Sequence, residues 1–365
     1  MTKKLKQKQR LTMNNAENTA IAEYRELSLS EIADRIAEAK NALIICHMNP
    51  DGDTVGSASA LYELIFACGG SATIACHDEI PRRLRFLTKE GAVLTPPVST
   101  EEFDTVFSID VASPAQLGDL SSVIDKIDFM IDHHAMGEVF TDYYIDPAAS
   151  AAGEIVFSIY EELKSRGIIG ENPEAARRMY AAIVSDTGSF KFSNTTEDTH
   201  KIAASLLSEI NFANDGGEST TDLCRKLFGQ RTLNELYAQM HAIQNLRFFE
   251  DGALGVVMFT TEMLEVAGLS ETDIGNAVET PRGVEGVLVG ISIRQLSSDP
   301  TKFKVSSRAN AEIDVAAVCA KFDGGGHVRA AGCTITAESP EDALGAAVEA
   351  FGEAVRNYRI EENKN

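Results

Sequence analysis

The stretch Phe129-Met130-Ile131-Asp132-His133-His134 constrains the fold of this chain more than any other. An apolar run that stops at one carboxylate and two imidazoles is typical of a buried strand that delivers metal ligands to the edge of a sheet. Adjacent side chains on an extended strand point to opposite faces, so a His-His pair alone also fits the plain end of a strand. The pattern becomes specific because other apolar segments end in the same way.

Three further apolar segments run directly into Asp or His. Ala42–Cys46 is followed by His47-Met48-Asn49-Pro50-Asp51-Gly52-Asp53, Thr105–Ile109 by Asp110, and the helical segment Met179–Ser185 by Asp186. Ligands of open parallel sheets bind outside the carboxyl ends of the strands, so we expect these polar groups to meet at one sheet edge. A single Asp at a strand end is more often a turn former, but four coincident ends favour a shared site. The expected set is His47, Asp51, Asp53, Asp110, Asp132, His133, His134 and Asp186.

Helical periodicity alternates with these strands, which predicts an α/β fold with a doubly wound, mainly parallel sheet. A capping box at Ser28–Glu31 begins the first helix, and Pro173 suits the first position of a later one. We expect a flexible basic arm over residues 1–27, a first domain over 28–242 and a smaller C-terminal α/β domain over 243–365.

The second domain is expected to bind substrate. Strand-like runs flank an Asp251-Gly252 turn, and a final helix is predicted over Pro340–Tyr358. The run Gly324-Gly325-Gly326-His327 lets backbone N–H groups approach an anion, although a flexible loop fits equally well. Arg308 and Arg329 are candidate phosphate partners, and solvated surface arginines are the alternative.

Composition narrows the function. A formal net charge of -22 argues against a protein that coats long nucleic acid, because such binding needs extended basic surfaces. No apolar run approaches the roughly 20 residues that span a bilayer, so we expect no membrane association. The six cysteines form no C-x-x-C pair, which predicts reduced thiols in a cytoplasmic protein. The sequence leaves open whether the chain forms a homodimer.

Several carboxylates with two or more histidines suit a pair of divalent ions. The carboxylate content favours Mn²⁺, whereas the general order of affinities favours Zn²⁺. The Pro-Asp-Gly turn can aim Asp51 and Asp53 at two ions, and Asp110 could bridge them. Two ions roughly 3.5–4 Å apart promote in-line displacement at phosphorus, which indicates phosphoester hydrolysis. Phe190 and Phe192 could stack a base, but core packing is the more frequent role.

The segments His47–Asp53, Ile109-Asp110, Ile131–His134 and Ser185-Asp186-Thr187-Gly188 resemble the four motifs of the DHH phosphoesterase superfamily. Gly324–Gly332 resembles the signature of its DHHA1 substrate domain. The resemblance covers about residues 40–355. The chain is similar above all to the nano-RNase and pAp-phosphatase group. Many relatives carry Thr-Asn shortly after the two histidines, where this chain has Met136-Gly137, so details of the substrate stay open.

The resemblance implies a role for each residue. One Mn²⁺ would be held by His47, Asp51 and Asp110, and the other by Asp53, Asp110, His133 and Asp186. Asp132 would orient an imidazole, and His134 would contact the scissile phosphate. Arg308, Gly324, Gly325, Gly326 and His327 would hold a further phosphate of the substrate.

The resemblance implies hydrolysis of short oligoribonucleotides to mononucleotides, from dinucleotides to about five residues, including linear products of cyclic dinucleotides. Adenosine 3′,5′-bisphosphate (pAp) is a second expected substrate. Two alternatives are a non-catalytic nucleotide-binding regulator and a cyclic-di-AMP phosphodiesterase. A regulator would be expected to have a broken ligand set, and all six proposed metal ligands are present.

Overall fold

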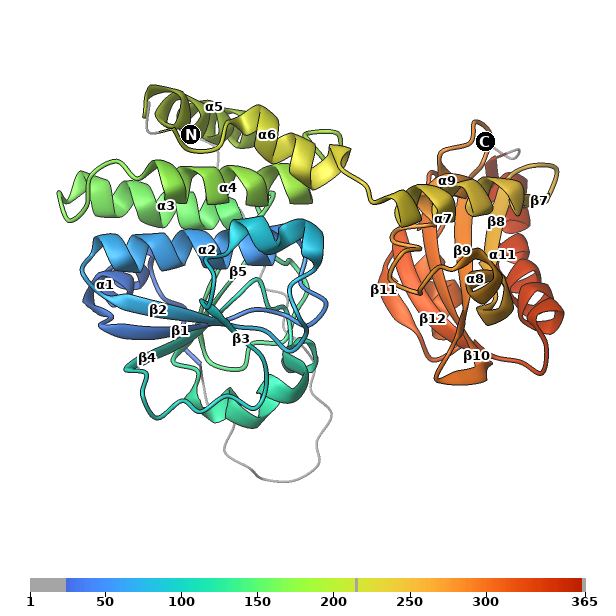
Figure 1. Cartoon of the computed structure of the whole chain (residues 1–365), viewed down its shortest axis with the longest axis horizontal. Helices are drawn as coiled ribbons and strands as arrows, with labels where there is room; N and C mark the ends of the chain where they lie inside the picture. The colour runs from blue at the N-terminus through green and yellow to red at the C-terminus, as the bar shows by residue number, and fades with distance from the viewer. Residues whose placement is uncertain (1–23, 214–215, 363–365) are drawn as a thin grey trace, which may run out of the picture. The chain divides into compact units, whose positions relative to one another are not determined.

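The computed structural model describes residues 24–213 and 216–362, and the expected arm over residues 1–27 lies almost wholly outside them. The chain divides after Gln230 into two compact units, which Figure 1 shows in blue to yellow and in yellow to red. None of the helices in the described ranges combines the length and apolar character needed to cross a membrane.

The first unit is built on a six-stranded sheet in the order β3-β2-β1-β4-β5-β6, and every neighbouring pair is parallel. This confirms the doubly wound α/β fold. The strands are β1 (Asn41–Ile45), β2 (Ser71–Ala75), β3 (Val93–Leu94), β4 (Thr105–Ile109), β5 (Phe129–Asp132) and β6 (Asp142–Ile145). Two strands were not expected from the sequence: β3, which has two residues, and β6, whose half-buried Asp-Tyr-Tyr-Ile shows no apolar run.

Alternate side chains of the strands enter two cores, as the period of an extended chain requires. Ile44, Ile109 and Ile131 pack under the α-helices, whereas Leu43 and Met130 face the 3-10 helix η2. In Figure 1 the helices lie above this sheet and η2 lies below it. The helical elements of the unit are α1 (Leu29–Glu38), α2 (Gly52–Ala67), η1 (Arg82–Leu87), η2 (Pro114–Lys126), α3 (Ala152–Ser165), α4 (Pro173–Asp186), α5 (Glu197–Phe212), α6 (Thr220–Cys224) and η3 (Arg225–Gly229).

The predicted helix starts are confirmed by their caps. Ser28 and Glu31 form the capping box of α1, and Pro173 occupies the first turn of α4 behind the cap of Asn172. These local bonds satisfy N–H groups that have no partner within a helix. They fix where α1 and α4 begin.

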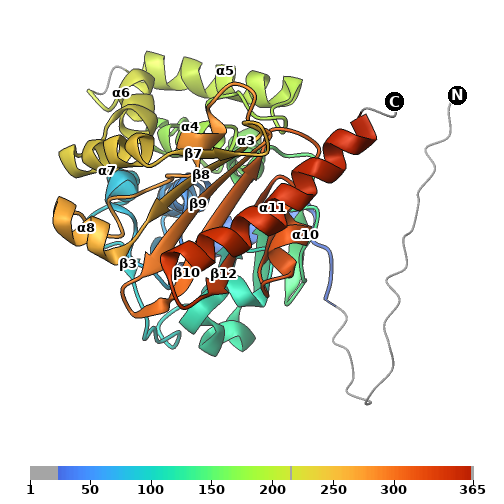
Figure 2. The same cartoon turned by 90° about the vertical axis from the view of Figure 1, so that its right-hand side faces the viewer.

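The second unit has its own six-stranded sheet, in the order β11-β12-β10-β9-β8-β7, in which only β8 and β9 are parallel among the described pairs. Figure 2 shows α10 and α11 on the face of the sheet turned to the viewer. The elements are α7 (Leu233–Gln244), β7 (Arg247–Phe249), β8 (Leu254–Phe259), α8 (Thr261–Ala267), α9 (Glu279–Arg282), β9 (Val289–Leu296), β10 (Asp299–Ala309), α10 (Val315–Ala320), β11 (Gly325–His327), β12 (Ala330–Thr336) and α11 (Pro340–Glu362).

The division after Gln230 precedes the expected boundary after Ala242. The difference is helix α7, whose Ala238 and Ala242 pack with Val257 and Phe259 of β8. The sequence shows the helix but not the sheet that it covers. A change from helical to strand-like patterning therefore does not mark the edge of a packed unit.

Gly56 allows α2 to approach α4 closely. A Cβ atom at this position would lie 2.9 Å from the Arg178 carbonyl oxygen and 3.0 Å from the Ala182 nitrogen. We predict that Gly56→Val destabilises the first unit by about 1–3 kcal/mol, because the helices would have to separate. Ala67→Val, at an exposed position of the same helix, is the control. Calorimetric unfolding of the full chain measures the effect, and equal stability of the two variants would contradict it.

Candidate metal centre

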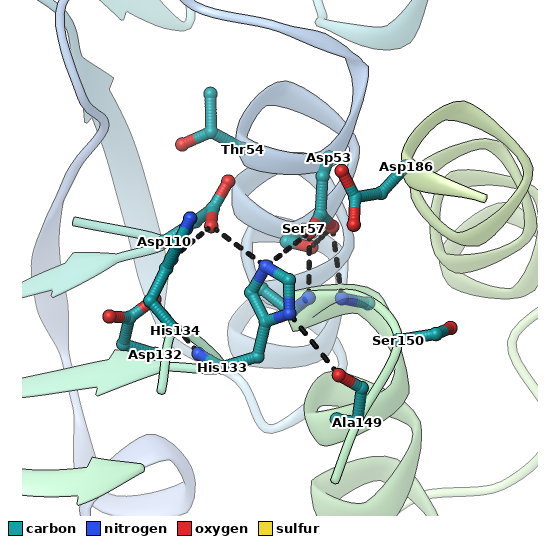
Figure 3. A network of polar contacts seen from close by, with 12 residues as sticks. Asp53, Thr54, Ser57, Asp110, Asp132, His133, His134, Ala149, Ser150 and Asp186 are labelled. Atoms are coloured by element: carbon teal, nitrogen blue, oxygen red, sulfur yellow. Dashed lines mark hydrogen bonds and ion pairs between the residues drawn. The ribbon is translucent and has the colours of Figure 1, made fainter. Parts of the chain in front are cut away.

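The carboxyl ends of β1, β4 and β5 and the carboxyl end of α4 deliver one cluster of carboxylates and imidazoles. The ligand atoms of His47, Asp51 and Asp110 lie within 4.8 Å of one another, and so do those of Asp53, His133 and Asp186. Figure 3 shows Asp53, Asp110 and Asp186 around the His133 ring. The structure thus brings together all six residues expected to hold metal.

Asp110 joins the two groups. Its Oδ2 lies 3.5 Å from His47 Nε2, and its Oδ1 lies 3.5 Å from His133 Nε2. Asp110 has a φ of 61°, in the left-handed region that Asp and Asn tolerate better than most residues. Its N–H donates to the Ile131 carbonyl at 2.9 Å, which ties this turn to β5.

Both imidazoles present the same nitrogen to the carboxylates. His47 Nδ1 lies 2.8 Å from the Met48 carbonyl oxygen, and His133 Nδ1 lies 3.2 Å from the Ala149 carbonyl oxygen. A carbonyl partner selects the tautomer with hydrogen on Nδ1, so Nε2 is left for a cation.

Asp51 and Asp53 are held in different ways. Asp51 caps α2 by accepting from the Asp53 and Thr54 N–H groups. Asp53 is 1% exposed and accepts from the N–H groups of Ala152 and Gly153, at 2.7 and 3.1 Å. Helix α3 follows Ala151, which has no polar side chain, so Asp53 supplies its N-terminal cap from a distant part of the chain.

The pKa values report a strongly negative environment. Burial opposes the charged form of His47, but Asp110 and Asp51 outweigh burial and raise its pKa to about 11. Burial likewise opposes charge on His133, and Asp110 and Asp53 raise its pKa to about 10. Burial, reinforced by Asp110 and Asp51 against the opposing effect of His133, raises the pKa of Asp186 to about 6. The negative charge of the carboxylates, which keeps these imidazoles protonated, also attracts divalent cations.

A buried oxygen of Asp110 without a hydrogen-bond partner in the described ranges is a further sign that these residues suit a metal pair. Asp110 is 2% exposed, and its Oδ1 has no hydrogen-bond partner among the described residues. A buried carboxylate oxygen without a donor is costly, and a cation between Asp110 and His133 would relieve that cost. Mixed imidazole and carboxylate donors suit divalent first-row metals.

Asp132 and His134 form a pair beside the cluster. Asp132 Oδ1 contacts His134 Nδ1 at 2.8 Å, and this bond raises the pKa of His134. His134 Nδ1 also lies 3.6 Å from Asp110 Oδ1. Because Nδ1 is engaged by Asp132, His134 is oriented by a carboxylate and has its Nε2 available.

Family comparisons match both units. The model of the DHH family, N-terminal domain, matches residues 41–183, and that of the DHHA1 domain matches residues 258–357. The chain thus contains a DHH domain followed by a DHHA1 domain. It is 29% identical, over 85% of its length and 89% of the relative, to the bifunctional oligoribonuclease and PAP phosphatase NrnA of Thermus thermophilus. The Bacillus subtilis protein of the same name is 28% identical over 79% of this chain and 87% of that relative.

A solved structure has the same fold as this chain. The exopolyphosphatase-related protein from Bacteroides fragilis superposes with a TM-score of 0.79 at 22% identity. The superposition covers 90% of this chain and 96% of that one. At this identity the likeness shows the fold alone.

The DHHA1 unit places Arg308 and His327 in one row. Both pair with Ala330 across neighbouring strands, so their side chains lie on the same face of the sheet, with about 10 Å between their strands. Arg308 is half-buried and has no ion-pair partner among the described residues, and burial lowers its pKa. Arg329 instead pairs with Glu312 at 3.2 Å. The row favours Arg308 over Arg329 as a phosphate partner.

The glycine run is an edge strand rather than the loop that the sequence also allowed. Gly325, Gly326 and His327 form β11, paired with β12. Gly326 has a φ of 140°, and a Cβ there would lie 2.6 Å from the Ala330 carbonyl oxygen. Glycine is therefore required at position 326, and β11, as an edge strand, keeps one row of backbone groups unpaired by the sheet.

Two contacts of the cluster were missed from the sequence. Ser57 Oγ donates to Asp53 Oδ1 at 2.9 Å, and Asn194 Nδ2 donates to Asp186 Oδ2 at 3.1 Å. Ser57 could have been found, because it lies one helical turn after Asp53. Phe190 stacks on His200 and contacts Tyr180, which fits core packing, whereas Phe192 is 48% exposed.

Asp110→Asn should weaken Mn²⁺ binding at both halves of the cluster by about tenfold or more, because Asp110 serves both. Asparagine preserves the shape of the side chain and tolerates the left-handed backbone. Titration calorimetry with Mn²⁺ measures the change. The exposed Asp125→Asn is the control for net charge. Unchanged binding by Asp110→Asn would remove Asp110 from the metal site.

Proposed function

We propose that this DHH protein is a two-metal phosphodiesterase that hydrolyses short oligoribonucleotides to mononucleotides and removes the 3′-phosphate of pAp. The observation that carries the proposal is the shared carboxylate: Asp110 lies between two groups of metal-type ligands. The names of the NrnA relatives support the choice of substrates.

Six residues would hold the metal pair, namely His47, Asp51, Asp53, Asp110, His133 and Asp186. When bound, Mn²⁺ would supply Lewis-acid chemistry, which neutralises phosphate charge and makes water acidic enough to attack at neutral pH. Asp110, the shared ligand, fixes the spacing of the two halves. Its buried position at the end of β4 gives it little freedom to move.

His134 would bind the scissile phosphate. Asp132 holds its Nδ1 and favours the charged imidazolium, so Nε2–H can donate to a phosphate oxygen whose charge grows during displacement. Asp132 is 1% exposed, so bulk water does not compete for this contact. The pair therefore stabilises negative charge next to the metal ligands.

The DHHA1 unit would recognise a further phosphate of the same substrate. Arg308 presents a guanidinium that forms no ion pair within the described part of the chain, and His327 and the N–H groups of β11 add donors in the same row. In a chain with a net charge of -22, such local donors are what allow an anion to bind.

Substrate length provides the first test. Because little of the surface attracts additional phosphates, kcat/KM should fall as RNA lengthens beyond about five nucleotides. Rates with Mn²⁺ should be compared over RNAs of two to twenty-four nucleotides, with pAp, pyrophosphate, and linear and cyclic dinucleotides in the same panel. Asp110→Asn is the inactive control. A flat or rising profile would favour a processive exonuclease, and binding without turnover would favour a regulator.

Arg308 provides the second test. Arg308→Gln should raise KM for a dinucleotide by about tenfold or more, because a charge-assisted phosphate contact is lost, while Mn²⁺ affinity stays unchanged. Arg329→Gln, which removes the same charge from an arginine already paired with Glu312, is the matched control. Equal effects of the two substitutions on KM would refute a specific role for Arg308.

A further inference from the structure

One half of the metal cluster rests on a single turn, Ala149–Gly153. The Ala149 carbonyl oxygen contacts His133 Nδ1 at 3.2 Å, and the N–H groups of Ala152 and Gly153 donate to Asp53. Figure 3 shows Ala149 and Ser150 beside these ligands. Among the described residues, no hydrogen bond joins the turn to His47 or Asp51.

Asn194 ties the remaining ligand of this half to the same turn. Its Nδ2 donates to Asp186 Oδ2 at 3.1 Å, to the Asp186 carbonyl at 3.2 Å and to the Ser150 carbonyl at 2.9 Å. All three partners are acceptors, so only the NH₂ end of the amide can face them. Asn194 Oδ1 is buried and has no hydrogen-bond partner in the described part of the chain.

The position of the turn is fixed from outside the cluster. Ala152 and Gly153 form the first turn of α3, whose buried Ile155, Val156 and Ile159 belong to the main core of the first unit. Asp186 ends α4, a different helix. Asn194 therefore links the end of α4 to the turn before α3 at the level of the ligands.

We propose that Asn194 is a positioning residue that sets the metal affinity of the Asp53–His133–Asp186 half and leaves the His47–Asp51 half unaffected. The inference rests on the metal pair of the proposed function. Without the amide, the Asp186 carboxylate can rotate, and the turn that orients His133 and Asp53 loses one of its anchors. Outer contacts of this kind typically change metal affinity by about 10- to 100-fold.

Mn²⁺ titrations of the full chain test the inference by calorimetry and electron paramagnetic resonance. The wild type should bind two ions that give a spin-coupled signal. Asn194→Ala should keep one site within about twofold, weaken the other by about tenfold or more, and give an uncoupled Mn²⁺ signal at one equivalent. Asn194→Ser, whose hydroxyl can donate one bond, should weaken the same site less, and it serves if the alanine variant folds poorly.

Double variants assign the affected half. Asn194→Ala should have a smaller further effect on metal binding in an Asp186→Asn background, where only its contact with the turn remains to be lost, and its full effect in an Asp51→Asn background. Asn41→Ala is the control for lost stability, because Asn41 Nδ2 donates to the Glu102 carbonyl at 2.8 Å at the start of β1. It should lower the melting temperature without changing either Mn²⁺ site.

The outcomes separate this inference from the proposed function. Equal weakening of both sites, or of neither, or additivity with Asp186→Asn, overturns the role of Asn194. If Asn194→Ala weakens one Mn²⁺ site selectively but the wild type hydrolyses no nucleotide, the inference stands and the proposed function is wrong. If the wild type has the proposed activity but Asn194→Ala binds Mn²⁺ as the wild type does, the inference alone is wrong.

Discussion

The mutual repulsion of buried carboxylates at one sheet edge is the constraint on which the rest of this structure depends. Asp53 and Asp110 are almost fully buried, and each has another acid nearby. Burying charge is costly unless it is compensated. Here imidazoles compensate Asp110, and the first turn of α3 compensates Asp53. The compensation is incomplete, since Asp110 Oδ1 accepts no hydrogen bond from the residues that the structure describes, and a divalent cation would complete it.

The expected metal ligands are also structural groups. Asp51 caps α2, and Asp53 caps α3, so the helix starts and the metal cluster are determined by the same side chains. The left-handed backbone of Asp110 is maintained by its bond to Ile131 and by Thr54, which donates to the Ile109 carbonyl. Strain held in this way at a functional group depends on the surrounding structure. The sheet, the caps and the cluster therefore support one another.

The sequence predicts the strands β1, β4 and β5, the parallel sheet and all six residues of the cluster, because apolar runs that end at charged residues are local signals. It does not predict β6, whose polar residues pair at the sheet edge, or the packing of α7 on β8. Asn194 is missed for a related reason. Its role comes from facing Asp186 and Ser150 in space, and nothing in the residues around it indicates which groups its amide will meet.

Arg308 and Arg329 show how the structure distinguishes residues that the sequence treats alike. Both lie near the glycine run, but Arg329 has an acidic partner, whereas Arg308 is half-buried and unpaired among the described residues. Desolvation without a counter-ion disfavours a cation, as the lowered pKa of Arg308 indicates. An anionic ligand would offset the desolvation free energy of Arg308, just as a cation would offset that of Asp110. Each unit thus carries an uncompensated charge of the sign that its proposed ligand requires.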